Sequence, residues 1–342
     1  PGGLIRRLGV TAGKNAPLAT AAVFVPLGAN LFETLLFSLV PYQSDGDAPI
    51  WERPALRTSD VEGERTREPL FGLTRVYTWM SRAVRLIPEP DGTVLAMGYG
   101  PGVVPVEEMP YSDPMCAYVQ KETVERRPVR LSLDRAFWRD FEALLPPDKP
   151  EEAVAKVPAV LTNARRLLGQ RGRDTFILPL AVLGQVTDQA KVLAMRREVY
   201  PFPLSALDAQ TAWFVRSALD MAESTGQDLR AAGLSACNAL LSLAGRTPPA
   251  DEVRRLLQSL PLLAHYWSQL EREFVEFLTR LGKAGDEQVM EQWTSSLRRA
   301  VHQAWSETER ALGVGPRHLR AIQAAERRVA AVLSSLSQEV TP

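Results

Sequence analysis

The chain has 342 residues, 45% of them hydrophobic and 23% charged, which is the composition of an ordinary globular protein with room for about two domains. Its 40 Lys and Arg residues balance 40 Asp and Glu residues, which argues against a cationic coat over the whole protein but allows local basic patches. Two cysteines, Cys116 and Cys237, exclude a disulfide framework and a four-cysteine zinc site, so we expect a reducing, cytoplasmic location.

The chain opens on a glycine-rich, purely basic stretch. Arg6, Arg7 and Lys14 precede the first acidic residue, Glu33. Such a loop suits close approach to an anion, although a flexible terminus is the simpler alternative. The sequence shows no secretory signal and no run of about 18 apolar residues, which predicts that it does not span a membrane. Because it does not begin with Met, we expect either that further residues precede Pro1 or that the chain has been cut.

Residues 30–200 show a mixed pattern of helix and strand signals. Residues 30–40 predict a short buried helix or strand ended by Pro41, and residues 43–68 predict an exposed connection. The next region predicts short strands at residues 76–80, 83–87, 94–97 and 129–133, with a turn at 90–93. The sequence then predicts a short helix at 137–145, a helix end at 163–168, and a buried strand at 176–183 that leads to Gly184.

After Pro203 the apolar residues recur at helical spacing. Four series run from Leu207 to Met221, Trp267 to Leu281, Met290 to Trp305, and Leu319 to Leu336, with breaks at 245–249, 282–285 and 313–316. Four or five amphipathic helices with short connections form an antiparallel bundle. We therefore predict an α+β protein, with a mixed α/β part at residues 1–203 and an all-helical, four-helix-type bundle at residues 204–342.

The usual catalytic templates are missing from the sequence. There is no G-x-x-x-x-G-K-[ST] loop and no G-x-S-x-G elbow. His265, His302 and His318 lie in predicted helices without a second ligand four residues later, and Asp113 and Asp134 lack a paired acid. We expect a binding or scaffold protein with no catalytic residues, no cofactor and no metal.

Basic residues gather modestly between positions 151 and 200. The stretch contains eight Lys and Arg residues and five Asp and Glu residues, and Lys191, Arg196 and Arg197 lie near its end. Phosphate contacts need such a local excess. Ordinary charge scatter on a solvated surface explains an excess of this size equally well.

Several stretches occur in an order that resembles one family. They are GANLFETL at 28–35, YTWMSRAVRLIP at 77–88, SDPMCAY at 112–118, and the pair 128–130 and 137–140. Together with the closing helical bundle, they resemble CasA, the large subunit of the type I-E CRISPR surveillance complex Cascade. The resemblance covers nearly the whole chain and matches the later part of a family member, which implies a front domain before Pro1.

The resemblance implies a non-catalytic role in RNA-guided antiviral defence. The guide RNA pairs with the target strand, while protein reads a short flanking motif, the PAM. The family member grips the PAM duplex from the minor groove, helps open the first base pairs and docks the helicase-nuclease. Implied partners are the backbone and small Cascade subunits, guide CRISPR RNA, target double-stranded DNA and the helicase-nuclease, without a membrane. The alternative is a scaffold subunit that binds proteins through its bundle and no longer reads DNA.

The resemblance also implies particular site residues. Gly2 and Gly3 remain from a glycine loop that follows the minor groove, where a side chain would keep the backbone from the groove floor. Residues 184–190 match a wedge hairpin of pattern G-x-x-x-x-Q-A, so Gln189 is the candidate wedge; a solvent-exposed turn residue is the alternative. The family's minor-groove lysine has no counterpart in residues 99–104, which predicts a relaxed or changed PAM preference. The candidate phosphate contacts are Arg6, Arg7, Lys14, Lys191, Arg196, Arg197, Arg298 and Arg299.

Overall fold

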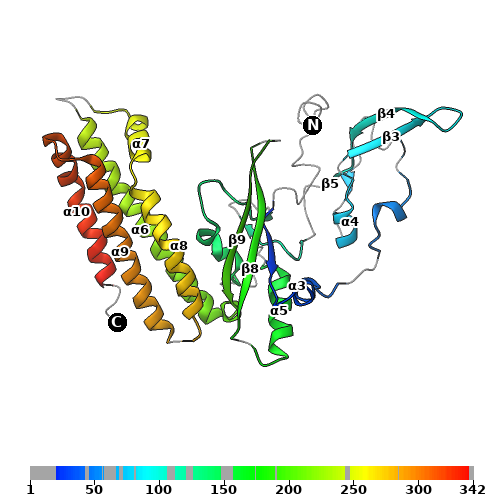
Figure 1. Cartoon of the computed structure of the whole chain (residues 1–342), viewed down its shortest axis with the longest axis horizontal. Coiled ribbons are helices and arrows are strands. Elements are labelled where there is room, and N and C mark those ends of the chain that lie inside the picture. The colour runs from blue at the N-terminus through cyan, green and yellow to red at the C-terminus, as the bar shows by residue number, and fades with distance from the viewer. Residues whose placement is uncertain are drawn as a thin grey trace. The chain divides into compact units, whose positions relative to one another are not determined.

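The computed structural model in Figure 1 confirms the predicted α+β class. It describes residues 21–42, 46–55, 57, 67–68, 72–80, 82–105, 112–120, 126–147, 157–173, 175–188, 191–242, 247–283 and 285–338. The chain divides into two compact units, one formed by residues 1–174 with 178–200 and the other by 175–177 with 201–342. Among the described residues, no helix is long and apolar enough to cross a membrane.

The first unit is built on a three-stranded sheet. Its strands are β1 (Val23–Pro26), β8 (Ile177–Asp188) and β9 (Lys191–Pro203), in the order β1–β8–β9. Strand β1 is antiparallel to β8, with Val23 opposite Leu183 and Pro26 opposite Leu180. Helices α3 (Leu31–Ser38) and α5 (Ala159–Gly169) pack against β1 and against each other.

An aromatic cluster forms the core beside this sheet. Phe24 of β1 lies 5.1 Å from Phe137, centroid to centroid, and Phe137 lies 6.1 Å from Tyr200 of β9. Phe137 and Phe141 belong to a short 3-10 helix, η3 (Phe137–Leu144), which confirms the helix predicted at 137–145. Burial of these large rings contributes several kcal/mol, at ~1.5–3 kcal/mol per side chain, so β9 and η3 hold each other in place.

Small elements complete the first unit. Strands β3 (Arg82–Pro88) and β4 (Val94–Pro101) form a hairpin, which confirms the predicted strands at 83–87 and 94–97 and the turn between them. The remaining elements are η1 (Ile50–Glu52), β2 (Arg67–Glu68), α4 (Leu73–Tyr77), β5 (Val104–Pro105), β6 (Tyr118–Gln120) and β7 (Arg126–Pro128). The predicted connection at 43–68 lies partly outside the described residues.

The prediction of a strand at 76–80 is wrong, because this stretch includes the end of helix α4. The side chain of Asp47 accepts hydrogen bonds from the backbone N–H groups of Thr74 (2.8 Å) and Arg75 (3.0 Å). This carboxylate satisfies donors that the first turn of a helix leaves free. The cap comes from a residue 27 positions away from Thr74, so strand composition alone misidentified the segment.

Two further predictions need correction. Residues 129–133 are not a strand, because the β6–β7 ladder ends with Pro128 opposite Tyr118; Val129 and Leu131 are nevertheless buried, which produced the alternating pattern. Residues 30–40 do form a helix, α3, but it is not buried: Phe37 faces inward while Leu31 and Phe32 are more than 70% exposed. Strand β8 also continues through Gly184 to Asp188 instead of leading only to that glycine.

The second unit is a helical bundle preceded by the short 3-10 helix η4 (Leu204–Leu207). Its helices are α6 (Ala209–Leu241), α7 (Ala250–Ser259), α8 (Leu262–Arg280), α9 (Asp286–Leu312) and α10 (Pro316–Gln338). The four long helices pack together, α6 against α8, α9 and α10, and α9 against α8 and α10. The predicted breaks at 282–285 and 313–316 are confirmed, and the break at 245–249 falls between α6 and α7, partly outside the described residues.

Small residues let α6 approach α8. A Cβ atom added at Gly226 would lie 2.5 Å from Cζ2 of Trp267, a separation that real Cβ atoms do not show. A glycine inside a helix costs about 1 kcal/mol relative to alanine. Here the lost propensity is offset by the close packing of the Trp267 ring over the glycine.

Both cysteines are free and buried, Cys116 in the first unit and Cys237 on α6. Burial raises the pKa of Cys237 to about 11, and burial together with the nearby Asp113 carboxylate raises the pKa of Cys116 as well. Because the thiolate is the reactive form, we expect neither side chain to react with iodoacetamide at pH 8 until the protein is unfolded. Mass spectrometry of the native and denatured protein measures this, and rapid native labelling of either residue would contradict the buried placement.

Candidate nucleic-acid interface

The β8–β9 hairpin contains the candidate residues that the structure describes in the first unit, Lys191, Arg196 and Arg197. The two strands are neighbours in the sheet and only residues 189–190 join them, so they must run antiparallel. Strand β1 pairs with β8 only between Leu180 and Leu183. Beyond Leu183 the hairpin continues without β1, as the long pair of strands in Figure 1 shows.

One side of β9 is fixed to the segment before η3. The Arg196 guanidinium donates to the carbonyl oxygen of Arg135 at 2.8 Å and to that of Ser132, and it forms an ion pair with Glu198. The Glu198 carboxylate also accepts from the backbone N–H of Phe137 at 2.9 Å and from the Tyr200 hydroxyl at 2.5 Å. We call Arg196, Glu198 and Tyr200 the clamp. It fixes the direction in which the other side of β9 faces.

Two neighbouring candidate phosphate contacts, Arg196 and Arg197, have different environments because of the clamp. Successive residues of a strand point to opposite sides. Arg196 belongs to the clamp and is largely buried, whereas Arg197 is exposed. Lys191, the first residue of β9, is exposed beside the connection. Among these three cations, Lys191 and Arg197 are therefore placed to meet a ligand, while Arg196 is engaged within the fold.

The other candidates in the first unit cannot be placed. Gly2, Gly3, Arg6, Arg7, Lys14 and Gln189 all lie outside the described residues. The stretch 99–104, where the family's lysine has no counterpart, is described. Gly102 and Val103 are buried there, and the Trp79 indole donates to the Val103 carbonyl oxygen at 3.2 Å. A Cβ atom at Gly102 would lie 1.9 Å from the carbonyl oxygen of Met80, so this position requires glycine.

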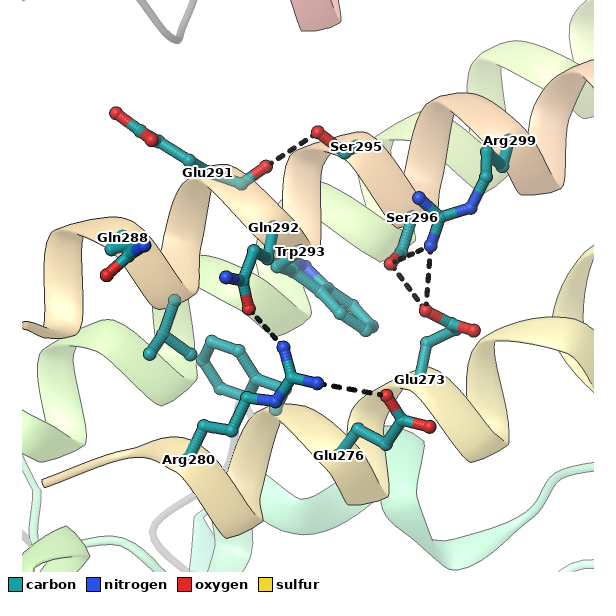
Figure 2. A pocket seen from close by; sticks show the side chains of 12 residues that line it. Glu273, Glu276, Arg280, Gln288, Glu291, Gln292, Trp293, Ser295, Ser296 and Arg299 are labelled. Atoms are coloured by element: carbon teal, nitrogen blue, oxygen red, sulfur yellow. Dashed lines mark hydrogen bonds and ion pairs between the residues drawn. The ribbon is translucent and has the colours of Figure 1, made fainter. Parts of the chain in front are cut away.

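Arg298 and Arg299 lie on α9 in the second unit. Arg298 is exposed. Arg299 donates to the Glu273 carboxylate at 3.0 Å and contacts the Ser296 hydroxyl at 2.8 Å. These contacts form one end of a groove between α8 and α9, with a volume of about 380 Å³ (Figure 2).

The groove has both apolar and polar lining residues. Trp293 and Phe277 are apolar members of this lining, and Arg280, another member, pairs with Glu276 at 3.7 Å. Burial raises the pKa of Glu273, but the Ser296 hydrogen bond and the Arg272 and Arg299 charges outweigh burial and lower that pKa below its ordinary value. Glu273 is therefore ionised at neutral pH. Because these polar groups contact one another, their evident role is to hold α8 against α9.

The motifs that carry the resemblance have structural roles. In GANLFETL, the Asn30 side chain accepts from the Glu33 N–H at 2.9 Å and Glu33 accepts from the Ala29 N–H at 2.9 Å, which is a reciprocal helix cap. In SDPMCAY, the buried Asp113 accepts from the Met115 N–H at 2.7 Å, and its own N–H donates to the Tyr118 hydroxyl at 2.8 Å. Both motifs specify local backbone geometry.

Sequence reasoning missed the exposed apolar residues of β9 and the Glu198 clamp. Leu193 and Met195 occupy alternate positions of β9, opposite in side to Arg196 and Glu198, a pattern that a strand prediction at 191–203 would have provided. The clamp had no such signal, because Phe137 and Glu198 are 61 positions apart. No group of three or more His, Cys, Asp or Glu residues within the described ranges is arranged to hold a metal ion.

Comparison with known proteins decides the family. The family described as "CRISPR-associated protein Cse1" matches residues 2–304. The chain belongs to the Cse1 family. The resemblance to CasA is confirmed, because "CRISPR-associated protein CasA/Cse1" of Thermus thermophilus is 45% identical to this Cse1-family chain over 350 residues, which cover 99% of this chain and 67% of that protein.

Solved structures of relatives share the Cse1 fold. The crystal structure of Thermus thermophilus CasA matches with a TM-score of 0.79 and 43% identity, covering 93% of this chain and 66% of that chain. A chain of a structure described as "CRISPR RNA-guided surveillance complex" matches with a TM-score of 0.60 at 23% identity, covering 92% of this chain and 60% of that one. This Cse1-family chain thus spans about two thirds of the length of its Thermus relatives.

Proposed function

We propose that this Cse1-family chain is the large subunit of a type I-E CRISPR surveillance complex that recognises the PAM duplex from the minor groove and helps open the target DNA. The observation that carries the proposal is the β8–β9 hairpin. Its two strands extend past β1, and the exposed Lys191 lies directly beside the connection that contains Gln189. A projecting element of this kind can enter between base pairs, and a cation next to it can meet the adjoining phosphate.

The proposed subunit is not itself catalytic and works with partners. Its sequence contains no nucleophile–base pair and no phosphate-binding loop, which supports binding over cleavage. Guide RNA, target DNA, the other subunits and a helicase-nuclease are the proposed partners, the last docked on this subunit. The shared fold with a chain of an RNA-guided surveillance complex supports assembly into such a complex.

One observation favours the alternative, a scaffold subunit that no longer reads DNA. The stretch 99–104 has no lysine, and its Gly102 and Val103 are buried. The alternative predicts that the assembled complex binds duplexes equally well whatever their PAM. PAM-dependent binding by the wild-type complex therefore distinguishes the two functions.

Gln189→Ala tests the wedge. We expect the variant complex to assemble normally and to bind pre-opened DNA like the wild type, but to open a closed duplex about tenfold more slowly. The reason is that unstacking costs a few kcal/mol per base step, and ~1.4 kcal/mol of lost compensation corresponds to a tenfold slower rate. Fluorescence of 2-aminopurine next to the PAM measures opening, and a gel of the same samples shows whether the DNA stays uncut.

The matched control is a duplex that already carries a bubble beside the PAM. Equal behaviour of both proteins on the bubble shows that the defect concerns opening alone. If Gln189→Ala opened closed duplex as fast as the wild type, Gln189 would be an ordinary turn residue. DNA cleavage by the purified subunit would contradict its non-catalytic role.

A further inference from the structure

Strand β9 presents an unusual combination of side chains on the side away from the clamp. Alternate residues there are Lys191, Leu193, Met195 and Arg197, which we call the outer strip. Leu193 is 43% exposed and Met195 is 79% exposed. Two apolar side chains thus lie in solvent between two cations on one strand.

The fold does not require this exposure. Residues of the opposite side of β9, Arg196, Glu198 and Tyr200, are held by hydrogen bonds to residues 132–137 and by aromatic packing. The clamp therefore holds β9 on both sides of Arg197, while Leu193 and Met195 are exposed without contributing to the core. Exposed apolar side chains on a hairpin that extends beyond its neighbouring strand indicate a binding surface.

The side chains of the outer strip indicate which kind of ligand it binds. Lys191 and Arg197 are six residues apart, a span of about 20 Å in an extended strand, so they suit an elongated ligand with repeated negative charge. The residues between them suit flat apolar surfaces. A separated DNA strand offers both, phosphates along its backbone and exposed base faces, whereas a duplex hides its base faces in the stack.

We propose that the outer strip holds one strand of the target DNA after the duplex has been opened. Phosphates meet Lys191 and Arg197, and sugars and base faces lie against Leu193 and Met195. This proposal rests on the proposed DNA-opening function and adds a place for the separated strand along the hairpin. Holding that strand slows re-pairing, because the strand must leave the strip before the duplex can close.

Binding of a fluorescein-labelled oligothymidylate of about 12 nucleotides to the full chain tests the proposal. Fluorescence anisotropy at several salt concentrations gives both the affinity and its salt dependence. The double variant Lys191→Ala/Arg197→Ala should reduce the slope of log K against log salt by about 1.4, at ~0.7 for each lost phosphate contact with a single strand. The double variant Leu193→Ala/Met195→Ala should bind about tenfold more weakly at every salt concentration with the slope unchanged.

Matched controls remove one exposed side chain of each kind elsewhere. Met97→Ala on β4 removes a methionine that is 65% exposed, and Arg254→Ala on α7 removes an exposed arginine. Both should bind the oligonucleotide like the wild type. Circular dichroism checks that every variant is folded, as expected for exposed positions.

The outcomes separate this proposal from the proposed function. The outer-strip proposal would be overturned if both double variants bound the oligonucleotide with the affinity and salt slope of the wild type. It would also be overturned if the wild-type chain bound no oligonucleotide. In either case the Gln189→Ala assay still measures duplex opening. Loss of complex assembly with oligonucleotide binding retained would identify the strip as a protein contact instead. A wild-type complex that opens no duplex would overturn the proposed function, whatever the strip binds.

Discussion

Replacing Trp293 with alanine is expected to destabilise the helical bundle by about 3–5 kcal/mol, the usual cost of removing a buried aromatic side chain. Trp293 is 2% exposed, and its ring lies 5.8 Å from Phe274 and 5.6 Å from Phe277. Its indole N–H donates to the Ala218 carbonyl oxygen at 2.9 Å. One side chain therefore joins α9 to both α6 and α8, and its removal leaves a cavity and takes away the hydrogen bond between α9 and the α6 backbone.

Hydrogen exchange followed by mass spectrometry measures this effect within the second unit. Amides of α6, α8 and α9 should exchange faster in Trp293→Ala at low denaturant concentration. The matched control is Trp213→Ala on α6, where the side chain is 59% exposed and the expected change is below about 0.5 kcal/mol. Similar protection in the two variants would mean that Trp293 does not organise the bundle.

The helical bundle is the part of the fold that the sequence predicts best. Its apolar series, such as Trp267 to Leu281, repeat at helical spacing over many turns. The local helix signal and the burial of one helix face therefore agree. Strand composition at 76–80 was misleading, because helix α4 begins with hydrogen bonds to a carboxylate from a distant part of the chain. Gly184 suggested the end of a strand. In the structure it continues the strand, and an added Cβ atom would lie 3.1 Å from Leu131 Cδ1.

The candidate site shows which distinctions need three-dimensional structure. Charge counting treated Arg196 and Arg197 alike. Adjacent residues of a strand face opposite sides, so one joins the clamp and the other remains exposed. The motif that resembles the family at 184–190 indicated the hairpin, but the residues that fix its direction, such as Glu198, contribute through contacts with remote segments.

Glu198→Ala is expected to cost about 3 kcal/mol in the free energy of unfolding of the first unit. The substitution leaves the Phe137 N–H and the Tyr200 hydroxyl without their acceptor and removes the ion-pair partner of Arg196. Unpaired groups in a largely buried site cost ~1–3 kcal/mol each, and a buried charge without its partner costs more. Glu198→Gln retains the shape and one carbonyl acceptor, so it should lose a smaller part of this stability.

Loss of the clamp should also impair DNA opening. The side of β9 that carries Lys191 and Arg197 keeps its direction because the clamp holds the opposite side, and a wedge that moves loses the energy it contributes to unstacking. We therefore expect Glu198→Ala to open closed duplex more slowly than the wild type even at temperatures where the variant is fully folded. Equilibrium denaturation and 2-aminopurine fluorescence measure the two effects, with the exposed variant Arg197→Ala as the control for stability. If Glu198→Ala proved as stable as Arg197→Ala and opened duplex at the wild-type rate, the direction of β9 would have to be fixed by the aromatic core of Phe24, Phe137 and Tyr200 alone.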